Sequence, residues 1–400
     1  MNKVKHLVAK YWAWMLAAIY LAAVAVYIFS HPDSLQWDFK TYYYAGLAFA
    51  RGQDPYFLHT LSTIAGQEIG FPFAYPPLTL PLFRLFSIGF KYSTAFSVYF
   101  VLKLTALGAL VVMWVRNFLP SKHLNIFPFV LIFGFSGAIY LDLVAGNISI
   151  FEQLGLWAAF LALRRRKVGL FSALIAIVAC FKITPIVFLL LPLLLDDQRY
   201  WKEPLAALAA WGGLQLASFA FQPQLYSNFL TLASRLDERM PHNPSILALL
   251  RDVSQWLSEK VMLLPDWLPI VVFLLLALTV IWMTWQRLRR SLDSWNYRLF
   301  LACLAYAIIM PRFKNYSFIL LLVPAYFFVV HVFDNRINIG LLLLLLSASI
   351  PLPFGLSGPA SNLVWGYYPI LFTALLWWLA VRLDQDHPPV KTDQILPKET

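Results

Sequence analysis

Long apolar runs separated by short polar stretches account for most of the 400 residues of this chain. A helix needs about 20 predominantly apolar residues to cross the hydrocarbon core of a bilayer, so the longest runs predict membrane-spanning helices. Several runs are shorter, and they would cross only if tilted or paired as half-helices. The apolar runs lie at about 11–29, 93–115, 125–141, 147–163, 168–181, 184–195, 204–221, 267–286, 296–310, 315–332, 337–350 and 363–382. This pattern predicts an all-α polytopic membrane protein with about twelve membrane helices, some of them short or broken.

Composition supports this class of protein. Hydrophobic residues make up 60% of the chain and charged residues 13%, whereas soluble globular domains carry about 25% charged residues. No fixed-period repeat, coiled-coil pattern or low-complexity linker divides the chain. We therefore expect one integrated membrane domain over 1–400, with long stretches outside the apolar runs at about 30–92 and 222–266. Cys180 and Cys303 both lie in apolar runs and predict no disulfide framework.

The basic residues predict which loops face the cytoplasm. The formal net charge is +11, and Lys and Arg form short clusters between the apolar runs. Because cytoplasmic loops are enriched in Lys and Arg, these clusters predict a cytoplasmic N-terminus and an even number of spans. The clusters are Arg116 with Lys122, Arg164–Lys167, Arg199 with Lys202, and Arg287–Arg290. Loops 142–146 and 351–362, which lack Lys and Arg, are expected outside with 30–92 and 222–266, and the tail at about 383–400 inside.

The distribution of Lys and Arg also indicates what these basic residues contact. Orientation in the membrane and contact with membrane lipids account for clusters between spans, so no nucleic acid is expected. The expected location is the bacterial cytoplasmic membrane.

The segment 71–90 is apolar enough to span but contains prolines at positions 72, 76, 77 and 81. Proline inside a helix removes a backbone donor and kinks or breaks the helix. Counting the segment as a span would also place the cluster Arg164–Lys167 outside. We therefore expect a re-entrant or surface-lying helix on the outer face.

An acid, Asp38, follows the first apolar run in the aromatic-rich segment W37-D-F-K-T-Y-Y-Y. A carboxylate at a membrane surface, beside rings that can stack on sugars, indicates a reaction site and favours an enzyme of lipid-linked substrates over a channel. Two structural interpretations stay open. Asp38 could cap a helix expected over 40–51 and ended by Gly52. Trp37 and the tyrosines 42–44 could form an interfacial aromatic belt.

Cations lie at two predicted helix breaks. Lys182 interrupts an apolar stretch three residues before a proline, and Arg312 and Lys314 follow Pro311. A lysine at the bilayer centre costs about 2.5–3.5 kcal/mol on insertion scales, so it is usually kept for a partner. Cations at breaks near the lipid surface suit a phosphate on a lipid carrier. The alternative interpretation is that these long side chains bind no phosphate and only extend toward the membrane surface, where their charges are solvated.

A further lysine, Lys103, lies in the middle of the run 93–115. We expect it to face the interior of the helix bundle, toward Asp142 or Glu152, because a charge facing lipid is unfavourable.

Other kinds of site lack support. The seven His residues are scattered, with no H-E-x-x-H motif, so no metal site is expected. Neither G-x-x-x-x-G-K-[ST] nor G-x-G-x-x-G occurs, and no G-x-S-x-G is present. We therefore expect no cofactor.

Five motifs in order resemble a known family. They are W-D-F-K-T-Y-Y-Y-A-G-L-A-F-A-R-G-Q-D-P-Y at 37–56, F-A-Y-P-P-L at 73–78, G-N-I-S at 146–149, F-K-I-T-P at 181–185 and H-N-P-S at 242–245. The ordered set resembles glycosyltransferase family 87, a GT-C-class group that includes polyprenol-phosphate-mannose-dependent α-mannosyltransferases. The resemblance covers roughly 37–330.

The resemblance implies roles for single residues. Asp38 matches the acid of the first outer loop, taken as the general base. Lys182 matches the family's Lys-Pro helix break, although two residues intervene before the proline here. Asn147 stands where the family often has Gln, and Pro244 is inserted in the family's Asn-x-Ser stretch.

The implied reaction is inverting, metal-independent transfer of a sugar, with a mannose-like hexose favoured. The donor is a polyprenyl-phosphate sugar and the acceptor a glycolipid or envelope glycan on the extracytoplasmic face, where no sugar nucleotide is expected. A phosphate leaving group needs a cation, and the predicted donor-phosphate contacts are Lys182, Arg312 and Lys314. The predicted substrate-binding residues are Trp37, Tyr42, Tyr75, Asn147, His242 and Asn243.

A lipid-linked sugar flippase or other transporter is the alternative function. Broken helices and intramembrane charge occur in both classes, but transporters often carry internal repeats, and the breaks at Lys182 and Pro311 share little flanking sequence. A purely structural scaffold would leave the segment around Asp38 and both breaks unexplained. The transferase interpretation is therefore favoured.

Overall fold

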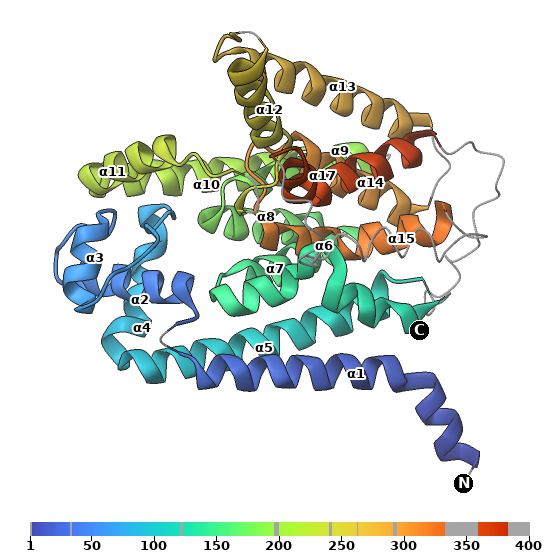
Figure 1. The fold of residues 1–400 in the computed structure, drawn as a ribbon, viewed down its shortest axis with the longest axis horizontal. Helices are drawn as coiled ribbons and strands as arrows, with labels where there is room; N and C mark the ends of the chain where they lie inside the picture. Colours follow the sequence, from blue (N-terminus) through green and yellow to red (C-terminus); the bar gives the residue numbers. More distant parts are fainter. Residues whose placement is uncertain are drawn as a thin grey trace. The chain divides into compact units, whose positions relative to one another are not determined.

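The computed structural model describes residues 2–32, 34–120, 123–195, 200–239, 242–261, 263–290, 294–332 and 359–382. Over these ranges the elements are helices and no β-strand is present, which confirms the predicted all-α fold (Figure 1). The α-helices are α1 (Asn2–Ser30), α2 (Trp37–Ala50), α3 (Leu58–Ala65), α4 (Leu80–Gly89), α5 (Tyr92–Asn117), α6 (Phe127–Ala145), α7 (Ser149–Arg164), α8 (Val168–Phe181), α9 (Leu191–Leu195), α10 (Lys202–Phe221), α11 (Pro223–Arg235), α12 (Ile246–Lys260), α13 (Leu268–Arg290), α14 (Trp295–Ile309), α15 (Leu322–Val332) and α17 (Pro359–Arg382). The 3-10 helices are η1 (Pro77–Thr79), η2 (Leu124–Ile126), η3 (Thr184–Leu190) and η5 (Asn315–Leu321).

Each predicted apolar run within these ranges coincides with a helix. Among the described residues, five helical segments are long and apolar enough to cross a membrane, namely Tyr11–Ser30, Tyr92–Asn117, Leu124–Ala145, Lys202–Phe221 and Leu268–Arg289. The shorter apolar helices, as expected, include Val168–Phe181, Thr184–Leu195, Trp295–Ile309 and Asn315–Val330. The predicted run 337–350, the tail 383–400, most of loop 351–362, Lys122 and Arg199 lie outside the described residues.

The chain divides into two compact units. Unit 1 comprises Met1–Ile19, Trp114–Ile139 and Glu238–Thr400, and unit 2 comprises Tyr20–Met113 and Tyr140–Asp237. Helices α1, α5 and α6 each continue from one unit into the other. The domain expected over 1–400 therefore contains two compact units that share three helices.

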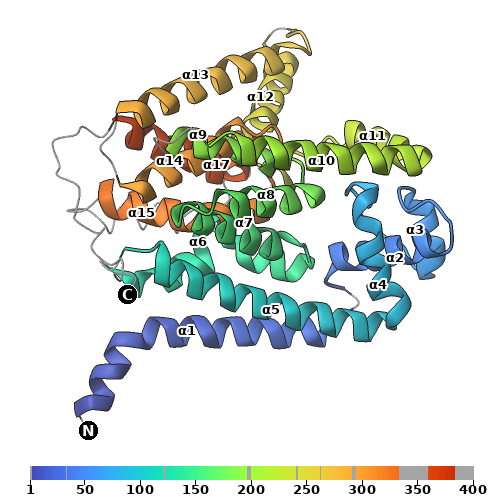
Figure 2. The ribbon, with the colours of Figure 1, turned by 180° about the vertical axis from the view of Figure 1, so that it is seen from behind.

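In unit 2, helices α7, α8 and α10 pack in series, and η3 packs against α8 and α10. Helix α2 contacts both α3 and α4, and the three form a cluster at the left of Figure 1. Helix α11 folds back against α10 (Figure 2). Phe29, near the end of α1, packs on Phe96 and Phe100 of α5 with ring centroids 5.5 Å and 5.0 Å away. The segment between α1 and α5 is thereby held at one end of these helices.

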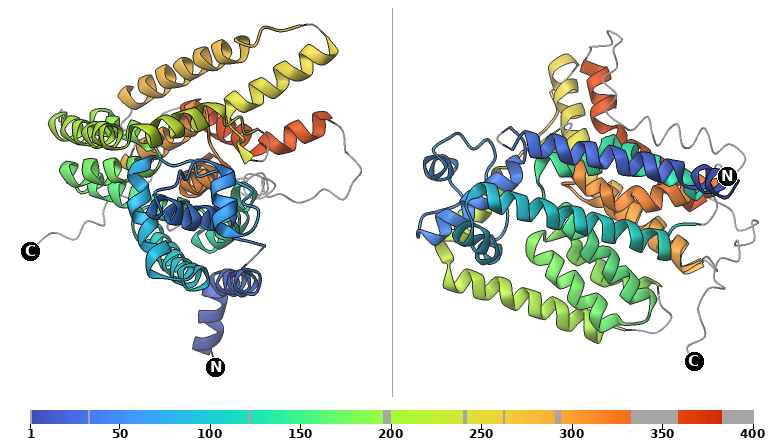
Figure 3. Two further views of the ribbon diagram at one scale, coloured as in Figure 1. Left: turned by 90° about the vertical axis from the view of Figure 1, so that its left-hand side faces the viewer. Right: turned by 90° about the horizontal axis from the view of Figure 1, so that it is seen from below.

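In unit 1, α14 contacts α13, α15 and α17, and α12 packs against α13 as a hairpin (Figure 3). Side-chain hydrogen bonds add to this packing: Trp377 Nε1 donates to Thr284 Oγ1 at 2.9 Å, and the Tyr297 hydroxyl donates to the Ala380 carbonyl at 2.5 Å. Helix α6 is interrupted at 134–137, where four residues leave helical φ/ψ values. Phe135 at this interruption stacks on Phe318, with centroids 5.2 Å apart.

The proline-rich segment 71–90 contains only a short helix. Helix α4 has 10 residues and is therefore about 15 Å long, half of the roughly 30 Å hydrocarbon core. Its buried residues include Leu80 and Phe83, whereas Leu85 is 67% exposed. This length is too short for a full span, and it is consistent with the predicted re-entrant or surface-lying helix.

Helices α2 and α4 approach each other closely at Gly46. A Cβ atom on Gly46 would lie 2.6 Å from the backbone C and O atoms of Phe83 and 2.8 Å from the backbone N of Arg84. Backbone atoms of a packed helix cannot move aside as a flexible side chain can, so only glycine fits here. The contact fixes α4 on the helix that carries Asp38.

We expect Gly46→Ala to destabilise the protein by about 1–3 kcal/mol, the usual cost of overpacking. Gly108→Ala, at a glycine of α5 with nothing within 4 Å of the added Cβ, is the matched control and should be neutral or stabilising because alanine favours helix. Thermal unfolding in detergent measures both variants. Equal midpoints for the two variants would show that α2 and α4 are not in close backbone contact.

Candidate functional site

The Asp38 carboxylate lies in the first turn of α2. The helix begins at Trp37, and its N-cap is Gln36, which has a left-handed φ of 62°. Asp38 therefore does not occupy the N-cap position that one sequence interpretation gave it, and the helix begins three residues before the expected 40–51. Its predicted end is confirmed, because Arg51 is the C-cap and Gly52 has a φ of 68°. A carboxylate in a first turn interacts favourably with the helix dipole.

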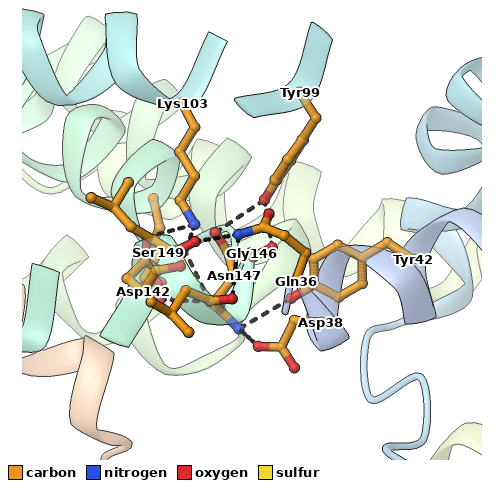
Figure 4. Close-up of polar contacts among 12 residues, drawn as sticks. Gln36, Asp38, Tyr42, Tyr99, Lys103, Asp142, Gly146, Asn147 and Ser149 are labelled. Atoms are coloured by element: carbon orange, nitrogen blue, oxygen red, sulfur yellow. Dashed lines mark hydrogen bonds and ion pairs between the residues drawn. The ribbon is translucent and has the colours of Figure 1, made fainter. Parts of the chain in front are cut away.

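Asn147, in the turn between α6 and α7, orients this carboxylate (Figure 4). Its Nδ2 donates to Asp38 Oδ2 at 2.6 Å and lies 3.1 Å from the Tyr42 hydroxyl. The same Nδ2 lies 3.4 Å from the Tyr75 hydroxyl. A neutral amide donor fixes the direction of a carboxylate without neutralising its charge. Three of the predicted site residues, from separate sequence motifs, thus meet at the amide nitrogen that holds the Asp38 carboxylate.

Tyr42 and Tyr75 are hydrogen-bonded to each other through their hydroxyl groups. The hydroxyls of Tyr42 and Tyr75 are 2.8 Å apart, and the Tyr56 hydroxyl donates to the Tyr75 carbonyl at 2.8 Å. Burial, followed by the negative charge of Asp38, raises the pKa of Tyr75 well above its usual value. Tyr75 therefore keeps its proton at physiological pH and remains a hydrogen-bond donor.

Ser149 connects Asn147 to Lys182. Asn147 Oδ1 accepts from the backbone N of Ser149 at 3.1 Å and from its Oγ at 2.8 Å. Lys182 Nζ donates to Ser149 Oγ at 2.7 Å and forms an ion pair with Glu152 Oε2 at 2.5 Å. Lys182 is the C-cap of α8, where the helix breaks before Pro185. The polar network thus continues from Asp38 through neutral groups to a lysine–glutamate pair.

Gly146 permits the close approach of α2 to the α6–α7 turn. Its φ is +71°, a region that favours glycine. A Cβ there would lie 2.6 Å from Gln36 Oε1 and 2.9 Å from the Cβ of Phe39. Helix α6 continues to Ala145, four residues beyond the predicted end of its apolar run, so Asp142 belongs to the helix rather than to an outer loop.

A second charged cluster lies in unit 1 around Glu238. Its Oε2 accepts from Arg312 Nε at 3.0 Å and Nη2 at 2.6 Å, and its Oε1 accepts from Lys314 Nζ at 2.7 Å. Burial raises the pKa of Glu238, but the Lys314 and Arg312 charges outweigh burial, and the pKa is lower than its usual value. Both predicted phosphate-binding cations of this segment are therefore paired with a carboxylate.

Asn243 links the chain segment at Glu238 to the segment that carries Arg312 and Lys314. Its Oδ1 accepts from the backbone N of Phe313 at 2.8 Å, and its Nδ2 donates to the Glu238 carbonyl at 3.1 Å. Ser245 Oγ adds a hydrogen bond to the Pro311 carbonyl at 2.8 Å. His242, next to Asn243, is exposed.

The sequence motifs thus fall into two groups in the structure. Unit 2 brings together Asp38, Tyr42, Tyr75, Asn147 and Lys182, and unit 1 brings together Asn243, Arg312 and Lys314. Trp37 is half-buried, with its ring 6.4 Å from that of Phe71.

Sequence reasoning missed Ser149 and Glu238 in these groups, and it considered Glu152 only as a possible partner of Lys103. Ser149 was part of the quoted G-N-I-S motif, and Glu152, which pairs with Lys182, lies three residues later on the same face of α7. Glu238 had no signal in the sequence. In the described part of the chain, no group of three or more His, Cys, Asp or Glu residues is placed to hold a metal ion.

Comparison with known proteins identifies the family. The model of glycosyltransferase family 87 matches residues 73–311, more than half of the chain. The chain belongs to glycosyltransferase family 87. No curated protein and no solved structure shows significant similarity to it.

Family membership, together with the apolar helices, establishes a membrane glycosyltransferase, whose substrates are a sugar donor and a glycan acceptor. The matched range contains Tyr75, Asn147 and Lys182, whereas Asp38 precedes it and Arg312 follows it directly. The hydrogen bond from Asn147 joins Asp38 to the matched range.

The ion pair beside the site makes a testable contribution to stability. Glu152 is 7% exposed and Lys182 21% exposed, so Lys182→Met should cost about 1–3 kcal/mol by leaving a buried carboxylate without its cation. Adding Glu152→Gln should recover most of this loss, because no unpaired charge then remains. Thermal unfolding in detergent gives the comparison. A double variant no more stable than Lys182→Met alone would contradict the pairing.

Proposed function

We propose that this enzyme transfers a hexose, with mannose favoured, from a polyprenyl-phosphate donor to a lipid-linked or envelope glycan on the extracytoplasmic face. The transfer inverts the anomeric centre, needs no metal ion, and uses Asp38 as the general base. The observation that carries the proposal is the 2.6 Å hydrogen bond by which Asn147, a residue of the matched range, orients the Asp38 carboxylate.

The chemistry needs one base and one stabilised leaving group. The acceptor hydroxyl oxygen attacks the anomeric carbon while Asp38 takes the hydroxyl proton. The bond between that carbon and the phosphate oxygen breaks, and the phosphate leaves with the electron pair. A single carboxylate suffices for one inverting displacement, and a positioned general base contributes typically 10²–10⁴-fold.

The neighbours of Asp38 support this role. Asn147 holds one carboxylate oxygen, and the phenols of Tyr42 and Tyr75 lie around the same amide nitrogen. Asp38 is only partly buried, so an acceptor hydroxyl can reach the carboxylate. Trp37 beside it supplies a ring face of the kind that stacks on sugars, and Trp37, Tyr42, Tyr75 and Asn147 stay our proposed substrate-binding residues here.

Lys182 is the proposed phosphate contact of unit 2. Its ammonium donates to Ser149 Oγ and pairs with Glu152, and it lies at the end of the polar network that begins at Asp38. In unit 1, Arg312 and Lys314 stay proposed phosphate contacts, with His242 and Asn243 proposed for the substrates. Glu238 reduces the net positive charge that these two cations present to an anion.

The proposed side of the membrane follows from the ends of the unit 2 helices. Asp38 follows the end of α1, Asn147 lies between α6 and α7, and Lys182 follows α8. The opposite end of α7 carries the cluster Arg164–Lys167, which favours the cytoplasm. No sugar nucleotide is expected outside the cytoplasmic membrane, so a donor anchored by a polyprenyl chain fits the proposed face.

Asp38→Asn should abolish most transfer while expression, detergent stability and donor binding survive, because the amide is isosteric but cannot take a proton. The readout is mass spectrometry of envelope glycolipids from a deletion strain complemented with each variant, which also identifies the missing sugar and its acceptor.

Glu68→Gln is the matched acid-to-amide control, since Glu68 is exposed in the same loop, and it should complement fully. Activity of Asp38→Asn within a few-fold of wild type would remove Asp38 from the mechanism and favour a transporter, which needs no base.

The proposed face is tested by labelling single cysteines in a variant in which Cys180 and Cys303 are replaced. A cysteine at Ser34, which is exposed just before α2, should react with an impermeant thiol reagent in intact cells. A cysteine at Gly169, exposed near the start of α8, should react only after permeabilisation. The reverse pattern would place Asp38 on the cytoplasmic side.

A further inference from the structure

Two fully buried charged residues lie at the turn that carries Asn147. Lys103 of α5 and Asp142 of α6 form an ion pair at 2.8 Å from Nζ to Oδ2, and both side chains are 0% exposed. The prediction that Lys103 faces inward toward Asp142 or Glu152 is thus confirmed for Asp142. Ionisable groups within membrane helices are costly, and they usually mark a function.

The ammonium of Lys103 also holds the backbone at the end of α6. It donates to the main-chain carbonyl of Asp142 at 2.5 Å. That carbonyl accepts in addition from the backbone N atoms of Gly146 at 3.1 Å and Asn147 at 3.3 Å. The carbonyl oxygen of Asp142 therefore accepts three hydrogen bonds, and these bonds close the turn that carries Asn147.

Tyr99 holds the other side of the same turn. It lies one helical turn before Lys103 on α5, and its hydroxyl donates to the carbonyls of Gly146 at 2.9 Å and Asn147 at 3.0 Å (Figure 4). Its ring stacks on that of Phe39 in α2, with centroids 4.4 Å apart. Helix α5 thus contacts the turn both at its start and at its end.

The residue before α2 is bound to the same turn. The backbone N of Gln36 donates to the Val144 carbonyl at 2.8 Å, and its side-chain Nε2 donates to the Leu143 carbonyl. The turn at 142–147 therefore supports both partners of the hydrogen bond between Asn147 and Asp38.

We propose that Tyr99 and the Lys103–Asp142 pair are positioning residues for the general base. They fix the 142–147 turn, and the turn sets where Asn147 places the Asp38 carboxylate. The proposal rests on the proposed role of Asp38 as base.

Stability by itself does not account for this pair. Replacing a buried ion pair by apolar residues of similar volume is often neutral or stabilising, because the cost of desolvating both charges disappears. An apolar pair, however, has no donor for the Asp142 carbonyl. What the charges add is a fixed donor aimed at the turn.

The first test is Tyr99→Phe, which removes one hydroxyl and little volume. The assay uses purified protein, polyprenyl-phosphate mannose and the glycolipid extract of the deletion strain. We expect kcat to fall roughly 10- to 100-fold, because misplacing a catalytic group by about 1 Å can cost 100-fold, while both KM values stay within about twofold. Tyr297→Phe, which removes another buried hydroxyl bound to a backbone carbonyl, is the control and should keep wild-type kcat.

The second test asks whether Tyr99 acts through Asn147. On an Asn147→Ala background, where the Asn147 amide no longer orients Asp38, Tyr99→Phe should change the single-turnover rate by less than about twofold, since effects within one network are not additive. An equal loss on both backgrounds would overturn the proposal, because Tyr99 would then act independently of Asn147.

The ion pair is tested by the double variant Lys103→Met with Asp142→Leu, which leaves no unpaired charge. We expect thermal stability in detergent equal to or above wild type, together with a kcat reduced roughly tenfold or more. A stable double variant with wild-type kcat would show that the pair has no positioning role. An unfolded one would also overturn the proposal, because it would make the pair a requirement for folding.

These outcomes separate the two proposals. If Asp38→Asn is active, the base assignment fails and the positioning role fails with it. If Asp38→Asn is inactive while Tyr99→Phe keeps the kcat of the Tyr297→Phe control, the base assignment stands and the positioning role is wrong.

Discussion

The amide of Asn147 donates to the Asp38 carboxylate across 2.6 Å and joins positions that are 109 residues apart in the chain. Several other contacts in unit 2 support one of these two side chains. Gln36 and Tyr99 hold the backbone of the α6–α7 turn, and Gly46 lets α4 pack closely on α2. The carboxylate thereby has a fixed direction, although the amide that holds it comes from a distant part of the chain.

The apolar surroundings decide how charges are arranged. In the helices of unit 2, Lys103 is paired with Asp142, and Lys182 with Glu152. A charge in a membrane interior requires a partner, and each partner fixes the position of the helix that carries it. The polar network from Asp38 to Lys182 also lies where helices end, since backbone groups at a break are tolerated only when they are buried in protein or line a cavity.

Charge pairing also changes how the predicted phosphate-binding cations are understood. Arg312 and Lys314 share Glu238, and burial together with these two cations sets the pKa of its carboxyl. A negatively charged substrate group approaching these cations must compete with an acid whose Oε2 already accepts two hydrogen bonds from Arg312 and whose Oε1 accepts one from Lys314. Such competition lowers non-specific attraction of anions to the segment, and favours a ligand that offers more acceptor oxygens than one carboxylate.

The sequence determined the helices and much of the site. Runs of apolar residues must be buried or face lipid, and these runs predicted each helical segment in the described ranges that is long and apolar enough to cross a membrane. Ordered motifs also selected Asp38, Asn147 and Lys182, which the structure joins in one network. The hydrogen-bond partners of these residues could not be predicted in the same way, because a hydrogen bond depends on which helix faces are brought together. That Gln36 and not Asp38 is the N-cap of α2, and that Glu238 pairs with Arg312, was decided only by tertiary packing. No local pattern in the chain encodes such contacts between distant segments.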